Sequence, residues 1–147
     1  MYDSQSEYRL LRRQTLQLLC QFDAGNDEEA FITNVPFDED LSTTVEPDKK
    51  ALTLANEIWE DRNASDTQIE ALTPEWPIHR QPLVDRNILR LARYEIISGI
   101  TPPIVAIDEA VELARIYSTE NSPSFVNGVL DNLYHQMTPL NSTDEKK

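Results

Sequence analysis

Apolar residues in the last third of the chain recur at intervals of three and four, the spacing that places them on one face of an α-helix. The clearest segment is 105–117, whose apolar face consists of Ile107, Ala110, Val111, Ala114 and Tyr117. Asp108 and Glu109 fall in the first turn of this predicted helix, where negative charge suits the helix dipole. Pro102 and Pro103 end the element before it, because proline interrupts a helix.

A second helix is predicted directly after the first. Ser122 is expected as its N-cap and Pro123 as its first helical residue, an order typical of helix starts. Its buried face is expected to consist of Phe125, Val126, Val129, Leu130 and Leu133. We therefore expect these two helices to pack against each other.

The same spacing predicts helices earlier in the chain, at residues 5–22, 48–62, 65–72 and 84–98. Gly99 follows the last of them and fits a C-terminal stop. Residues expected to face the core are Leu11, Thr15, Leu18, Leu19 and Phe22 in the first helix and Ile88, Leu91, Ala92 and Ile96 in the last. Strict apolar–polar alternation is scarce, so the sequence predicts an all-α fold, a compact bundle of about six to seven helices in two packed helical subdomains.

The length of 147 residues fits one domain. We expect it to cover residues 1–137, with an acidic connection at 25–47 and a polar tail at 138–147. No segment approaches the roughly 18 apolar residues of a membrane span, and no charged-then-apolar leader follows Met1. These features predict a cytoplasmic protein.

The net charge of −13 has the wrong sign for a simple nucleic-acid binder. Much of the acidic excess lies at 25–47, where seven acidic residues occur without a basic one. This segment either repels RNA or keeps the protein soluble, and the second role is the ordinary one for a solvated acidic connection.

Three motifs, VDRNILRLARYEI at 84–96, AIDEAVELAR at 106–115 and FVNGVLD at 125–131, stand in a characteristic order. The chain thereby resembles the NusB family of transcription antitermination factors, clearly over 76–133 and more weakly in the first helix. The resemblance implies a helical domain that binds the boxA element of ribosomal RNA leaders. It also implies a partner, small-subunit ribosomal protein ten (NusE), within the RNA polymerase antitermination complex, and it allows a homodimer.

Arg9, Arg12 and Arg13 fall within an arc of roughly 100° on the first helix, so they could face one phosphodiester strand together. From the residues alone, a solvated basic face that pairs with nearby acids is the better explanation of these three arginines. The resemblance implies that they bind boxA RNA. Cys20 lies further along the first helix, where the family commonly has an aromatic residue, so the resemblance places Cys20 on the RNA face. Because it is the single cysteine of the chain, the composition instead favours a role for Cys20 as a small buried hydrophobic residue.

The start of the last helix supplies further RNA candidates, because free backbone N–H groups there can receive a phosphate or a base edge. Asn121 and Asn127 flank this start, and Asn127 could equally satisfy hydrogen bonds between helices. Phe125 is either a core residue or, by the resemblance, a base-stacking one. The helix at 84–98 carries a stripe of arginines, for which intramolecular ion pairs are expected. Arg86 is the member of this stripe that lies nearest to any RNA path. Glu95 on that helix needs an arginine partner from another helix if it is buried.

The surface expected to meet the basic partner NusE is acidic or neutral, with candidates Glu75, Asp108, Glu109 and Glu112. The alternative function is a protein-interaction module of the same fold that has lost RNA binding. His79 and His135 are isolated, and no nucleophile–base motif, phosphate loop or metal-ligand spacing occurs. Neither catalysis nor a cofactor nor a metal is therefore expected.

Overall fold

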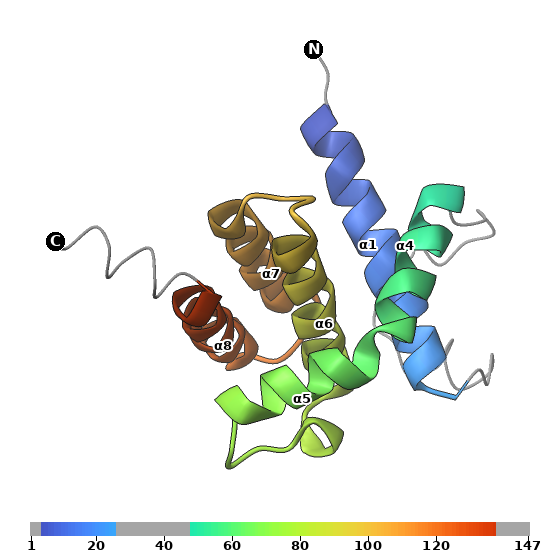
Figure 1. Cartoon of the computed structure of the whole chain (residues 1–147). Helices are drawn as coiled ribbons and strands as arrows, with labels where there is room; N and C mark the ends of the chain where they lie inside the picture. The colour runs from blue at the N-terminus through green and yellow to red at the C-terminus, as the bar shows by residue number, and fades with distance from the viewer. Residues whose placement is uncertain (1–3, 26–47, 138–147) are drawn as a thin grey trace, which may run out of the picture.

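The computed structural model describes residues 4–25 and 48–137, and all regular secondary structure in these ranges is helical (Figure 1). The elements are α1 (Ser4–Asp23), α4 (Lys49–Glu60), α5 (Arg62–Leu72), the 3₁₀ helix η1 (Ile78–Arg80), α6 (Leu83–Ser98), α7 (Pro103–Tyr117) and α8 (Ser122–Met137). The predicted all-α fold is confirmed. The acidic connection and the polar tail that the sequence predicts lie, apart from Gly25, outside the described residues.

Helix α6 is the centre of the bundle, since it contacts every other α-helix of the described residues. Figure 1 shows α1 and α4 side by side along one flank and α7 and α8 on the other. The packing predicted between the last two helices is confirmed. Side chains that are almost completely buried fill the space between these helices, among them Leu16, Leu19, Ile58, Ile69, Ile88, Leu89, Leu91, Leu130 and Leu133.

The predicted core positions of α6 are all buried, and so are most of its other residues, because the other helices of the bundle surround it. On α1 the prediction holds in part. Thr15 and Leu19 are buried, whereas Leu11, Leu18 and Phe22 are half-buried. The α1 face that packs on the bundle is therefore rotated toward Leu16, whose side chain has no exposed surface.

Several helix ends differ from the prediction for local reasons. Gly99 does end α6, in the left-handed conformation with φ 78° that glycine adopts without a side-chain clash. Helix α7 begins already at Pro103, whose fixed φ suits a first helical position, so Asp108 and Glu109 lie beyond the first turn. The start of α8 also shifts: Asn121, not Ser122, is the N-cap, since its carbonyl oxygen accepts the Phe125 backbone N–H at 3.2 Å.

No described helix combines the length and apolar character that crossing a membrane requires.

Candidate nucleic-acid interface

The arginines of α1 do not form the single exposed arc that the sequence predicts. The Arg9 side chain is 59% exposed, and its Nε and Nη2 donate to Glu109 Oε2 on α7 at 3.3 and 3.1 Å. Arg12 is buried instead. Its Nε donates to Glu95 Oε2 on α6 at 2.8 Å and its Nη2 to Thr101 Oγ1 at 3.3 Å. The prediction that Arg12 faces a phosphodiester strand is wrong for this structure, because α1 turns that side toward α6 and α7.

Glu95 confirms the expectation that a buried carboxylate on α6 requires an arginine from another helix. Its side chain is 1% exposed, and Arg12 provides the counter-charge. Burial raises the pKa of Glu95 above its ordinary value, although the charge and hydrogen bond of Arg12 act in the opposite direction. The pair therefore joins α1 to α6 inside the protein.

A groove of about 260 Å³ runs between α1 and α7. Its charged lining comes from Arg9, Arg12 and Arg13 on α1 and from Glu109 and Glu112 on α7. The cations of α1 thus face the carboxylates of α7 across the groove, and Glu112 also pairs with Arg115. The groove brings together residues that the sequence assigns to RNA and residues that it assigns to a protein partner.

A second cluster lies where the connection after α5 meets the start of α8. The rings of Trp76 and Phe125 meet edge to face, with centroids 4.7 Å apart. They line a hollow of about 370 Å³ together with Glu75 and Ser124. Phe125 is half-buried and Trp76 is 37% exposed, so the indole is the more accessible ring.

Sequence reasoning missed Trp76, because it lies in no periodic segment. The sequence did contain one signal. This tryptophan lies between Pro74 and Pro77, outside any helical pattern of apolar residues that would indicate a core position. Asn121, just before α8, and Asn127, on α8, are both exposed, as an RNA role requires, but neither lines the hollow. The predicted partner residue Glu75 lies here, away from the α1–α7 groove that contains Glu109 and Glu112.

Cys20 has no exposed surface, so the placement of this residue on an RNA face is wrong and the expectation of a small buried hydrophobe is confirmed. Burial, and then the nearby charge of Asp23, raises the pKa of the thiol well above its ordinary value. The thiol is therefore a packed, protonated group between α1 and its neighbours.

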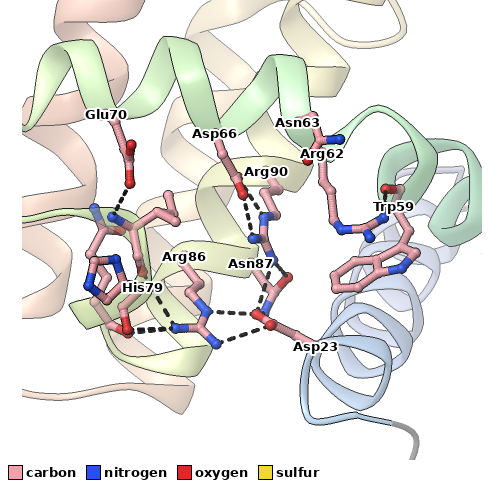
Figure 2. Close-up of polar contacts among 12 residues, drawn as sticks. Asp23, Trp59, Arg62, Asn63, Asp66, Glu70, His79, Arg86, Asn87 and Arg90 are labelled. Atoms are coloured by element: carbon pink, nitrogen blue, oxygen red, sulfur yellow. Dashed lines mark hydrogen bonds and ion pairs between the residues drawn. The ribbon is translucent and has the colours of Figure 1, made fainter.

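Arg86 belongs to an ion-pair network rather than to an open surface (Figure 2). Its Nε and Nη2 donate to the two carboxylate oxygens of Asp23 at 2.7 and 3.0 Å. Arg90 donates to Asp23 as well, at 3.0 Å, and binds Asp66 on α5 through two bonds of 2.8 and 2.9 Å. The intramolecular pairs expected for this stripe are confirmed.

Asp23 is the shared acceptor of this network at the end of α1. Burial by itself would raise the pKa of its carboxyl, but hydrogen bonds from Arg86 and Asn87 and the charges of Arg90 and Arg86 prevail and lower that pKa below the ordinary value. The network therefore fixes the C-terminal end of α1 to α6, and through Arg90 to α5.

The model of the NusB family matches residues 9–135, which is most of the chain. The chain belongs to the NusB family. A relative similar over nearly its full length is the transcription antitermination protein NusB of Solibacter usitatus, 40% identical over 135 residues that cover 91% of this chain and 92% of that protein.

Solved NusB structures share the fold. The chain is similar to NusB of T. maritima, with 36% identity, a TM-score of 0.66, and coverage of 84% of this chain and 87% of that one. It is also similar in fold to a chain in the crystal structure of antitermination factors NusB and NusE in complex with dsRNA, with 24% identity, a TM-score of 0.69, and coverage of 90% and 98%.

Proposed function

We propose that this protein is a non-enzymatic transcription antitermination factor that binds RNA together with NusE. The observation that carries the proposal is the match to a NusB antitermination protein over more than nine-tenths of both chains. The neighbour of the same fold that was crystallised with NusE and dsRNA guides the choice of partner for the test.

The RNA that we propose is a single-stranded boxA-like element of ribosomal RNA leaders. Two features of the described surface support RNA binding. Arg9 presents an accessible guanidinium, which can bind a phosphate through two parallel hydrogen bonds. Trp76 and Phe125 offer an aromatic hollow against which a base can stack, and such stacking tolerates any base. Asn121, which is exposed at the start of α8, is uncharged and so does not repel RNA.

The isolated protein is expected to bind RNA weakly, because its net charge is −13 and Arg9 is already paired with a carboxylate. A basic partner would meet exposed acids such as Asp108 on α7. Joining two weak RNA-binding surfaces in one complex raises the effective concentration of each toward the RNA. NusE binding is therefore proposed as the step that makes RNA binding effective.

The test is a fluorescence anisotropy titration of labelled boxA-like RNA and of a scrambled RNA of equal composition, with the chain alone and with NusE. We expect the complex to prefer the boxA-like RNA and to lose affinity when Arg9 is changed to glutamine. Arg80→Gln is the matched control, since it removes an exposed arginine of η1 outside both clusters. Equal binding of both RNAs would instead favour a protein-interaction module without RNA specificity, which the carboxylate partners of Arg9 and Arg12 also suit.

A further inference from the structure

The carboxylate of Glu109 links Arg9, the residue best placed to bind RNA, to α7, the helix best placed to bind a basic partner. Glu109 of α7 divides its two oxygens between arginines of α1: Oε2 accepts from Arg9 at 3.1 and 3.3 Å, and Oε1 lies 3.8 Å from Arg12 Nη1. The resemblance to the NusB family implies an RNA role for Arg9 and a protein-partner role for Glu109. In the folded protein the two residues bind each other.

The two arginines depend on Glu109 to different degrees. Arg12 is buried and has a carboxylate of its own, Glu95, at 2.8 Å. Arg9 is 59% exposed, and the carboxylate that the structure places against it is Glu109. Loss of the Glu109 charge would therefore change the state of Arg9 far more than that of Arg12.

The Nε–Nη2 edge of Arg9 is a donor pair that also suits a phosphate. Glu109 occupies this edge with a single oxygen, so an RNA phosphate and the carboxylate compete for the same two N–H groups. The Arg9 end of this ion pair is open to solvent, and solvent-accessible ion pairs are weak, which makes the exchange easy.

Glu109 is also within reach of a partner's cation. Its side chain is 13% exposed, and it lines the groove of about 260 Å³ between α1 and α7. The exposed Asp108 and the half-buried Glu112 lie on the same helix and add negative charge that favours the approach of a lysine or arginine.

We propose that Glu109 is an internal competitor for the RNA phosphate at Arg9, and that a basic partner which pairs with Glu109 releases Arg9 for RNA. Partner binding and RNA binding are then coupled through one carboxylate, and the coupling is reciprocal. This inference rests on the proposed RNA-binding function and adds how the RNA site is regulated.

The test compares Glu109→Gln with Glu112→Gln in anisotropy titrations of the boxA-like RNA. Both variants remove one charge from the same groove, but only Glu109 contacts Arg9. We expect Glu109→Gln to tighten RNA binding by the chain alone about threefold to fivefold, the scale of an exposed ion pair. The logarithmic salt slope should steepen by about 0.7, as for one further phosphate on a single strand. Glu112→Gln should give a clearly smaller change in both quantities.

Two further variants separate this coupling from general charge effects. Glu109→Asp keeps the net charge but draws the carboxylate away from Arg9, so RNA binding should still tighten. In an Arg9→Gln background, Glu109→Gln should have no greater effect than Glu112→Gln. With purified NusE present, the partner-induced gain in RNA affinity should be smaller for Glu109→Gln than for the unchanged chain, by the factor gained without NusE. Urea unfolding midpoints check that each variant is folded.

The inference is overturned if Glu109→Gln and Glu112→Gln behave alike, or if the Glu109 effect persists without Arg9, while the complex still prefers boxA-like RNA. If the unchanged complex fails to distinguish boxA-like from scrambled RNA, the proposed function fails, and the inference fails with it.

Discussion

Arg12 provides the sharpest test of whether the basic residues of α1 are scaffold or RNA ligands. Changing Arg12 to glutamine would leave Glu95, with 1% of its side chain exposed, without its counter-charge. Removing one partner of a buried ion pair costs about 3–5 kcal/mol of unfolding free energy. For a chain of 147 residues, each kcal/mol lowers the melting temperature by about 2–4 °C, so the expected decrease is about 10 °C.

The assay is urea and thermal unfolding followed by far-UV circular dichroism. Arg9→Gln is the matched control, because it removes an arginine one turn away on the same helix whose ion pair is exposed, and it should cost less than about 1 kcal/mol. The double variant Arg12→Met/Glu95→Met removes both charges and should recover most of the lost stability. An Arg12→Gln variant as stable as the unchanged chain, but weakened in RNA binding, would refute the structural role of Arg12.

The cost of Arg12→Gln should also depend on pH. Burial already raises the pKa of Glu95, and loss of Arg12 removes the charge that opposes this shift. A carboxyl group whose folded pKa exceeds its unfolded pKa favours folding at low pH, and that contribution disappears as the pH rises through the folded pKa. The stability difference between the unchanged chain and Arg12→Gln should therefore widen from about pH 4 to pH 8.

Three further predictions concern other parts of the structure. Cys20→Tyr forces a ring into a fully buried position and should cost about 1–3 kcal/mol in urea unfolding without any gain in RNA affinity; a tighter RNA complex would restore Cys20 to the RNA face. Asp23 has a lowered folded pKa, so its contribution to stability is present above its unfolded pKa and is lost as the pH falls through the folded one. Asp23→Asn should therefore flatten the acid side of the pH–stability curve, and an unchanged curve would contradict the network. Trp76→Leu should weaken RNA binding by on the order of 1–3 kcal/mol in anisotropy titrations while Arg80→Gln, outside the hollow, does not share this loss; equal losses would remove the hollow from the RNA path.

Much of the fold could be predicted from periodicity, because burial in a helical bundle imposes a 3.6-residue pattern on each helix separately. Helix α6 begins within one residue of its predicted start and ends where predicted, and its need for an arginine beside Glu95 followed from the cost of burying a charge. Which arginine meets that need depends on how α1 is rotated against α6. The residue pattern of α1 does not determine that rotation, so the sequence predicted an exposed position for Arg12.

The candidate site was harder to predict for the same reason. Trp76 lies in an irregular connection, and its contact with Phe125 joins segments far apart in the sequence. The pairing of Arg9 with Glu109 likewise spans 100 residues. Charge patterns within one helix identify residues that need ion-pair partners, but tertiary packing determines which residues those partners are.

The measurement that tests the central claim most directly is the affinity of the chain for boxA-like and scrambled RNA, with and without NusE, at one fixed salt concentration. Antitermination function predicts weak binding by the chain alone, and with NusE a clear preference for the boxA-like RNA that is reduced by Arg9→Gln and unaffected by Arg80→Gln. A NusE complex that binds both RNAs equally, and is indifferent to Arg9, would contradict it.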